Sequence, residues 1–527
     1  MATTQPVDGD SAGTFLGHPK GLYVLFFAEM WERFSYYGMR ALLIFYLTKH
    51  WLFSDSDAGV IYGAYTALVY ITPVVGGYLA DKYLGQRKAV LFGAVLLTLG
   101  HFFMAFEGEP AVGTENNPIV LVFWLALALI IVGSGFLKAN ISVIVGQLYP
   151  RTDTRRDAAY TIFYMGINLG AAIGSLLCGY IGETYGWAYG FGLAGIGMLA
   201  GLVVFVWGKP LLLGRGEPPK PLAKNTEWSM YGIGIAMVGV CWLAIQYQDM
   251  VGYVLGLFGG ALVLYVLFTA VVKLPSEERD RIFAAMFLIL TSIVFWALFE
   301  QAGSSLNLFT DRHVDRGGVP ASVFQSINAI YIILLAPVFA VVWQTLGRKG
   351  AEPSAPLKFG LGVVQVGLGF LVLVWGAQSV GMEAAVPVLF IFLIYLLHTT
   401  GELCLSPVGL SAMNRLAPAH MASLIMGTWF FASATGNFAA GLIAAATGAE
   451  GVGEEAGKQV VLDVYSTVGW YAVAIGVGVM VISPLIKKLM HLDTLQDDDV
   501  GDDLLGQAEG PGEPQGAGIH PETRPRV

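Results

Sequence analysis

Four charged side chains lie in one apolar segment near the start of the chain: Glu29, Glu32, Arg33 and Arg40. The segment reads AEMWERFSYYGMR and is flanked by the apolar runs GLYVLFF and ALLIFYL. An ionised side chain at the centre of a bilayer costs about 2.5–3.5 kcal/mol on insertion scales, so charge in such a stretch needs a reason. At about 100° per residue, the four charges share one side of a helix. We expect this polar face to look into a helix bundle.

Two tyrosines, Tyr36 and Tyr37, fall on the same side of that helix. The alternative interpretation is a structural cluster of ion pairs that only locks helices together. Helices in a membrane can pack through small residues at a far lower cost. The sequence therefore favours a functional site on this face.

Other polar residues stand alone in apolar runs and should converge on the same site. Lys138 lies in IIVGSGFLKANISVIVG, Glu300 in FLILTSIVFWALFEQAGSS and Glu402 in FLIYLLHTTGELCLSPVG. Ionisable residues inside a membrane are functional candidates by default. Asn168 and Asn328 are weaker candidates, because an interhelical hydrogen bond would also explain either one. For Asn328 the two interpretations stay equal.

The composition is that of an all-α polytopic membrane protein. Of 527 residues, 55% are hydrophobic and only 13% are charged, whereas a soluble domain carries about 25% charged residues. Runs of about 20 apolar residues, each long enough to cross a bilayer, recur along almost the whole chain. The three cysteines, Cys178, Cys241 and Cys404, lie inside such runs and are interpreted as core residues.

We predict fourteen membrane spans. Their approximate ranges are 21–50, 56–81, 88–106, 118–148, 157–182, 187–208, 229–247, 252–273, 280–310, 321–346, 357–379, 385–415, 420–447 and 461–488. The predicted organisation is an N-terminal tail (1–20), a six-helix half (21–208), a linker (209–228), an inserted helix pair (229–273), a second six-helix half (274–490) and a disordered acidic tail (491–527).

Loop charges orient the chain. Most loop Lys and Arg, such as Lys82, Arg156 and Lys488, fall on one side when the N-terminus is placed inside. Cytoplasmic loops carry such an excess, so both termini are expected in the cytoplasm of a multi-pass protein of the cell (inner) membrane. No cleavable signal peptide is expected, because residues 1–21 are polar and lack a short apolar core.

Two six-helix halves are the pattern of the major facilitator transporters, whose halves rock around a site at the midplane. The inserted pair returns the chain to the same side, so it leaves this topology intact. The loop GGYLADKYLGQRK (76–88) also resembles the motif between helices 2 and 3 of that superfamily. We expect the major facilitator fold with one added helix pair.

Longer motifs resemble one family within it, the proton-dependent oligopeptide transporters. EMWERFSYYG (29–38) matches the ExxERFxYYG motif, and FYMGINLG (163–170) matches FYxxINxG. Lys138, FWALFEQ (295–301) and GELCLSPVG (401–409) match in kind and order, so the resemblance covers about residues 20–490. One departure is that animal members have a functional His on helix 2, which is absent here. Proton handling must then rest on carboxylates.

The resemblance implies symport of protons with di- and tripeptides. The peptide carboxylate would bind Arg40 and Lys138, and the ammonium would bind Glu402 with Asn168 and Asn328. Arg can bind a carboxylate bidentately, whereas Lys acts as a point charge. Aromatic residues would line the side-chain pockets: Tyr36, Tyr37, Tyr70, Trp296 and Trp429.

Coupling would rest on charges that change partners. The resemblance implies that Arg40 pairs with Glu300 on the outer side and Lys138 with Glu402 on the inner side. Glu29, Glu32 and Arg33 would form a network at the inner end of the first helix that reaches Lys138. Protonating a carboxylate weakens its ion pair and shifts the balance between two conformations.

Two rival functions remain. The same scaffold could carry another anion, such as nitrate, which would have no need for Glu402. A membrane enzyme or receptor is the other class, but HTTGEL (398–403) supplies only His398 and Glu402 of an HExxH metal site. We expect no enzyme activity, no cofactor and no bound metal. The expected partners are peptides, protons and membrane lipid, without nucleic acid, and the expected state is a monomer.

Overall fold

The apolar runs of the sequence form long helices. The computed structural model describes residues 13–109, 118–149, 153, 155–449 and 453–492. In chain order the α-helices are α1 (Lys20–Phe45), α2 (Asp55–Leu79), α3 (Gln86–Met104), α4 (Pro118–Gln147), α5 (Arg155–Tyr185), α6 (Trp187–Trp207), α7 (Lys224–Gln246), α8 (Gln248–Lys273), α9 (Ser276–Phe299), α10 (Ser305–His313), α11 (Ser326–Arg348), α12 (Ala355–Val380), α13 (Leu389–Leu416), α14 (Ala422–Ala446) and α15 (Glu454–Leu489). The predicted acidic tail after 492 lies outside the described residues.

Thirteen helical segments among the described residues are long and apolar enough to cross a membrane. The fourteenth predicted span is α1, which has 26 residues but carries too many charges to qualify by composition. α9 and α10 together form one span, Ser276–His313. The predicted all-α polytopic fold is therefore confirmed.

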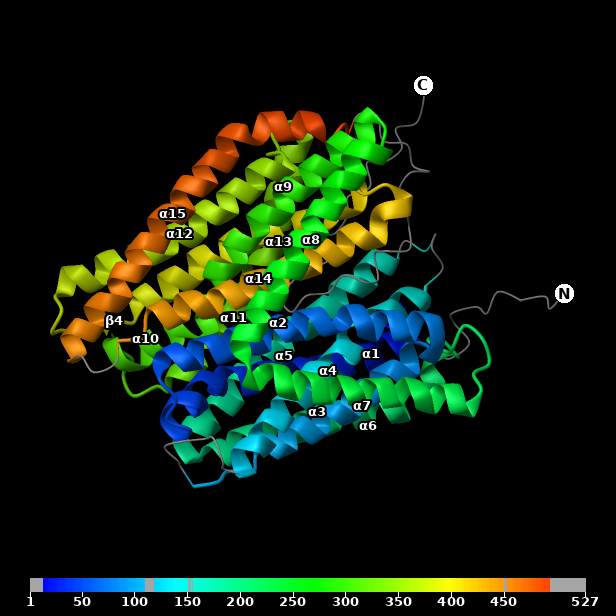
Figure 1. The fold of residues 1–527 in the computed structure, drawn as a ribbon, viewed down its shortest axis with the longest axis horizontal. Helices are drawn as coiled ribbons and strands as arrows, with labels where there is room; N and C mark the ends of the chain where they lie inside the picture. Colours follow the sequence, from blue (N-terminus) through cyan, green and yellow to red (C-terminus); the bar gives the residue numbers. More distant parts are fainter. Residues whose placement is uncertain (1–12, 110–117, 150–152, 154, 450–452, 493–527) are drawn as a thin grey trace.

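The helices form two bundles that lie side by side in Figure 1. In the N-terminal bundle α1 packs against α5 and α6, and α4 packs against α2 and α3. In the C-terminal bundle α12 packs against α13 and α15, and α9 against α14. Each bundle has its own buried apolar cluster. This is the two-half architecture that the sequence predicts.

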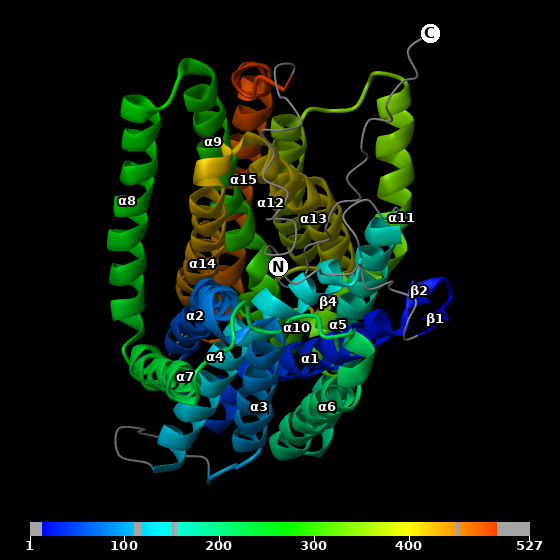
Figure 2. The same cartoon turned by 90° about the vertical axis from the view of Figure 1, so that its right-hand side faces the viewer.

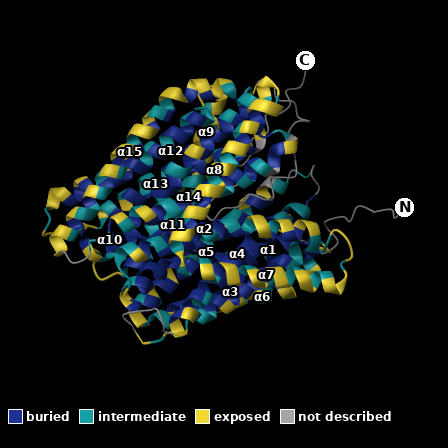
Figure 3. Cartoon of the chain, in the orientation of Figure 1, coloured by how far each residue is buried: buried dark blue, intermediate teal, exposed yellow. Residues whose placement is uncertain are grey.

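The inserted pair, α7 and α8, is divided between the two bundles. α7 packs on α4 and α2, whereas α8 packs mainly on α14 and α9 and also contacts α2 through its first turns. Figures 1 and 2 show the two helices diverging from the turn that joins them. Only 22% of the most apolar 18-residue stretch of each helix is buried, against 78% for α4. Both helices show many exposed residues in Figure 3. The pair therefore lies at the periphery.

Several boundaries differ from the predicted ones. α7 begins at Lys224, inside the range predicted as linker, and Lys209–Leu212 forms a 3-10 turn. α1 and α2 each end in a π-helical turn, at Tyr46–His50 and Ala80–Leu84. The described residues also contain short strands: β1 (Thr14–Phe15) pairs with β2 (His18–Pro19), and β3 (Val314–Asp315) pairs with β4 (Val386–Pro387).

The two halves meet at one face of the molecule, where α1 ends and α2 begins. This face is called the outer face below, following the predicted topology. Arg312 pairs there with Asp55, with a distance of 2.8 Å from Nη2 to Oδ1, and Lys49 pairs with Asp311 at 2.7 Å. A third pair, Arg40–Glu300, joins the halves at a more buried level, so the structure is closed on its outer side.

Glycines let the halves approach on that side. Gly63 on α2 faces Gly441 on α14, and a Cβ added at Gly63 would lie 2.7 Å from the Cα of Gly441. One turn earlier, a Cβ added at Gly59 would lie 2.8 Å from the backbone nitrogen of Ala445. Small residues allow this kind of backbone contact between membrane helices.

Candidate functional site

The charged face of α1 is buried in the N-terminal half. Glu29, Glu32 and Arg33 are all fully buried. Arg33 Nε donates to Glu29 Oε1 at 2.6 Å and lies 3.3 Å from Glu32 Oε2. Buried charges persist when they are paired and hydrogen-bonded. The three side chains thus form the compact charge network predicted for the inner part of α1.

Lys138 on α4 joins this network from the side. Its Nζ lies 3.8 Å from the ring centroid of Tyr36, a cation–π contact, and within electrostatic range of Glu29 and Glu32. The ammonium is 2% exposed and has no hydrogen-bond partner among the described residues. A buried cation with unused donors is suited to an anion that arrives from elsewhere.

Arg40 reaches across to the other half. Its Nη2 donates to Glu300 Oε2, and its Nε donates to the Tyr62 hydroxyl at 2.5 Å. The rings of Tyr37 and Tyr62 lie 5.8 and 5.7 Å from the guanidinium carbon. The expected Arg40–Glu300 pair is therefore formed, and it lies between the halves.

Tyr62 was not among the predicted site residues. Its signal in the sequence is the pair Tyr62 and Tyr65, three residues apart in the second apolar run. This spacing puts two phenols on one helix face inside a bundle, where buried hydroxyl groups usually have hydrogen-bond partners. The sequence did not reveal which of the two would meet Arg40.

Glu300 lies at a break in its helix, which the sequence analysis treated as continuous over 280–310. α9 ends at Phe299, Glu300–Gly303 forms a 3-10 turn, and Ser304 has φ −125° and ψ −101°. Gln301 bridges the break by donating to Ala440 O at 2.9 Å on α14. Interrupted helices at membrane depth typically mark transport sites, and the freed backbone groups need such partners. The signal was the run of small residues AGSS that follows Gln301.

Glu402 on α13 is held by a neighbouring helix. Its Oε2 accepts a hydrogen bond of 3.0 Å from Asn328 Nδ2 on α11, and the same amide lies 3.0 Å from Thr399 Oγ1. The carboxyl group is nearly fully buried. The Lys138–Glu402 ion pair expected on the inner side is not formed in this structure, because Lys138 packs on Tyr36 and the halves meet on the outer side. Asn328 therefore makes an interhelical hydrogen bond, as the alternative interpretation predicted, and its partner is the acidic candidate Glu402.

Asn168 on α5 and Tyr70 on α2 are two further predicted site residues of the N-terminal half. Asn168 Nδ2 donates to the carbonyl of Tyr164, one turn earlier on α5, at 3.2 Å. Its helix packs tightly on α1, since a Cβ added at Gly170 would lie 3.0 Å from Arg33 Cβ. Tyr70 on α2 is 7% exposed and lies within electrostatic range of Glu300.

The two tryptophans differ in their surroundings. Trp296 lies one turn before Glu300, stacks edge-on with Phe299 at 5.4 Å and packs over Gly436. Trp429 is fully buried against Phe359 and Gly409 within the C-terminal half. The structure thus brings Trp296 to the break beside Glu300, whereas the contacts of Trp429 are those of a core residue.

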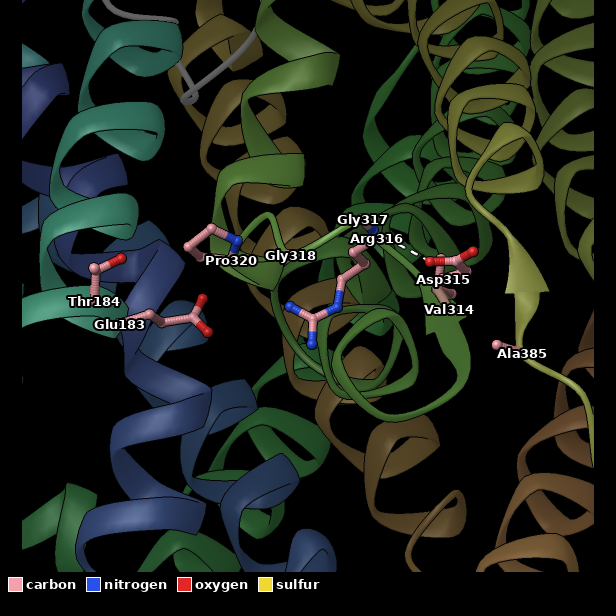
Figure 4. A pocket seen from close by; sticks show the side chains of 9 residues that line it. All are labelled: Glu183, Thr184, Val314, Asp315, Arg316, Gly317, Gly318, Pro320 and Ala385. Atoms are coloured by element: carbon pink, nitrogen blue, oxygen red, sulfur yellow. Dashed lines mark hydrogen bonds between the residues drawn. The ribbon is translucent and has the colours of Figure 1, made fainter.

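One cavity lies away from these residues. A pocket of about 560 Å³ opens on the outer face between the end of α5 and the segment that joins α10 to α11 (Figure 4). Its lining residues are Glu183, Thr184, Val314, Asp315, Arg316, Gly317, Gly318, Pro320 and Ala385. None of the predicted site residues lines it. With the outer side closed, those residues are mostly shielded, and all but Tyr37 and Asn328 are less than a tenth exposed.

Comparison with known proteins shows the family to which the chain is related. Residues 87–455 match the model of the POT family. The chain is 38% identical to the peptide transporter YePEPT of Yersinia enterocolitica, over 82% of this chain and 88% of that protein. It is 34% identical to a di-/tripeptide transporter of Lactococcus lactis, over 80% and 88%.

A solved structure of a POT family transporter in complex with 5-aminolevulinic acid superposes with a TM-score of 0.76 at 33% identity, covering 90% of this chain and 98% of that one. The matched motifs, the broken helix at Glu300 and the two-bundle fold with its inserted pair agree with these similarities. The chain therefore belongs to the POT family of proton-dependent oligopeptide transporters.

Proposed function

We propose that this protein imports di- and tripeptides together with protons by alternating access. The observation that carries the proposal is the Arg40–Glu300 ion pair, which joins the two halves of a chain whose outer side is closed. An ion pair between two moving bodies stabilises the conformation in which it forms. A proton that neutralises its carboxylate releases that conformation.

The substrate is oriented by its two terminal charges. Arg40 and Lys138 bind the peptide carboxylate, and Lys138 is suited to this because its ammonium group has unused donors. Glu402, held by Asn328, binds the ammonium. These groups recognise the ends of a peptide and leave its side chains to the aromatic residues, so peptides of many sequences can bind.

Glu300 is the proton-coupling group, assisted by the network of Glu29, Glu32 and Arg33. When Glu300 is ionised it holds Arg40 and keeps the outer side closed. When it is protonated, Arg40 is free for the peptide carboxylate and the outer side opens. The α1 carboxylates share Arg33 as their ion-pair partner, at 2.6 Å for Glu29 and 3.3 Å for Glu32, so the three side chains act as one network.

Transport of a small inorganic anion is the second candidate. An anion such as nitrate carries no ammonium, so its transport would not explain the buried pair of Glu402 and Asn328. The same pair is explained at once by an amphoteric substrate. In the cell membrane, with both termini in the cytoplasm, the inward proton gradient would drive peptide uptake.

Uptake by the purified protein in liposomes tests this function. An inward proton gradient should drive accumulation of labelled dialanine above its outside concentration, and dissipating the gradient should abolish it. Unlabelled dialanine should compete, whereas nitrate and N-acetylated dialanine should compete poorly. Strong competition by nitrate without any by dialanine would favour the anion transporter.

A further inference from the structure

The Tyr62 hydroxyl lies at the junction between the two halves. Tyr62 is on α2, is 1% exposed, and accepts the hydrogen bond from Arg40 Nε. α1 and α2 belong to the same half, so this bond does not itself cross between the halves. The bond holds the guanidinium group at Nε, while Nη2 remains directed at Glu300.

The break in the α9–α10 span encloses this hydroxyl from the other side. A Cβ added at Gly303 would lie 1.8 Å from the Tyr62 hydroxyl oxygen and 3.3 Å from Arg40 Nε. Only a residue without a side chain leaves room for the phenol at this point. The 3-10 turn that carries Glu300 is therefore fitted around Tyr62.

We propose that Tyr62 is a positioning residue for the Arg40–Glu300 ion pair, holding the guanidinium in the orientation that closes the outer side. This proposal rests on the proposed function, in which that pair is the coupling element. Without the hydroxyl, Arg40 keeps its charge but loses one charge-assisted hydrogen bond and the orientation that this bond enforces. The closed state with ionised Glu300 is then less stable, so a smaller proton concentration opens it.

Other titratable or charged groups surround this pair. From the N-terminal half, the groups within electrostatic range of Arg40, Tyr62 or Tyr37 are Arg33, Tyr36 and Tyr37 on α1, Tyr65 and Tyr70 on α2, and Lys138 on α4. From the C-terminal half they are Glu300 at the helix break and Tyr395 and Glu402 on α13. Among them, Tyr62 is the phenol whose hydroxyl is hydrogen-bonded to Arg40. Tyr65 provides the matched comparison, since it is equally buried on the same helix but has no hydrogen-bond partner among the described residues.

The test measures how far the outer side is open as a function of pH, without peptide. Spin labels at Asp57→Cys on α2 and Val319→Cys before α11 report the distance between the halves, in a background where the three native cysteines are replaced. Both positions are exposed on the outer face. Tyr62→Phe should move the pH of half-opening upward by about one unit, the size expected from losing one charge-assisted hydrogen bond. Tyr65→Phe should leave it in place.

A second background separates positioning from general destabilisation. In Glu300→Gln the opening should not depend on pH over this range, and adding Tyr62→Phe should then produce no pH-dependent change. A purely structural role for Tyr62 would lower the thermal stability without moving the midpoint, and that result would overturn the proposal. Equal shifts in Tyr62→Phe and Tyr65→Phe would overturn it as well. Because no peptide is present, a wrong substrate assignment would leave this measurement unaffected.

Discussion

At the scale of single residues, the site separates two kinds of charge. Arg33, Glu29 and Glu32 form ion pairs with one another within α1, whereas Arg40 depends on the opposite half for its carboxylate partner. Lys138 stands between them with unused donors. Breaking a buried pair by removing one member leaves a costly unpaired charge. Conservative substitutions that keep the shape are therefore the informative ones.

Glu402→Gln should weaken dipeptide binding by about 10- to 100-fold, the expected loss of one charge-assisted contact. Binding of N-acetylated peptides should hardly change, because they lack the ammonium that Glu402 binds. Titration calorimetry with dialanine and its acetylated form measures the difference. Glu352→Gln, at an exposed carboxylate that pairs with Lys358, serves as the control. An unchanged dialanine affinity in folded protein would show that the substrate orientation is wrong.

Glu300→Gln should uncouple transport from protons while leaving exchange intact. The amide keeps the shape of the protonated carboxyl group, so Arg40 is permanently free for substrate. Counterflow and proton-driven uptake measured in the same liposomes give the two readings. We expect retained counterflow and lost accumulation. Continued uphill uptake would move the coupling role to the α1 carboxylates.

At the scale of elements, the outer face closes because α2 and α14 touch through glycine. Gly63→Val should wedge these helices apart, since overpacking of this kind costs about 1–3 kcal/mol and so shifts the closed-to-open ratio about 5- to 150-fold. The spin-label distance between 57 and 319 should lengthen and uptake should slow. Gly256→Val on α8 is the control, because no atom lies within 4 Å of a Cβ placed there. An unaltered spin-label distance in Gly63→Val would show that the contact between Gly63 and Gly441 does not control closure of the outer face.

The linker is clamped to the turn between α2 and α3. Arg87 Nε donates to Glu217 Oε1 at 2.7 Å, and this hydrogen bond holds the pKa of Glu217 below its usual value. Gly85, at φ +75°, leaves room for Pro218, whose backbone nitrogen would lie 2.5 Å from an added Cβ. The linker thus moves with the N-terminal half.

A lowered pKa sets the pH range in which this clamp acts. The pair stabilises the fold above the ordinary pKa of Glu, about 4.3, and the contribution is lost as the pH falls through the lower folded value. Glu217→Gln should therefore lower the melting temperature slightly at pH 7, since the pair is partly exposed. The difference from the unmodified protein should shrink as the pH falls below about 4.3 and vanish once the pH lies below the folded pKa of Glu217. A difference that persists there would point to packing instead of charge.

At the scale of the whole molecule, local patterns predicted the spans, the two halves and the charged face of α1. They also indicated Glu300, Glu402 and Lys138, because an ionisable group alone in an apolar run stands out. They did not reveal Tyr62 or the break after Phe299. Each of these depends on contacts between helices far apart in sequence, and apolar periodicity carries no information about such contacts.

The attachment of α7 and α8 to different halves has a consequence for the surrounding bilayer. Trp242 Nε1 on α7 donates to Leu121 O at 3.1 Å, whereas Gly252 and Gly259 on α8 pack against phenylalanines of α14. If α7 follows α4 and most of α8 follows α14 when the halves rock, the angle between the two helices changes about their turn at Tyr247. The cross-sectional area that the protein occupies in the lipid then changes during each cycle. Transport should therefore do work against the lateral pressure of the bilayer, and turnover should vary with lipid acyl-chain packing more strongly in the intact protein than in a variant lacking 224–273.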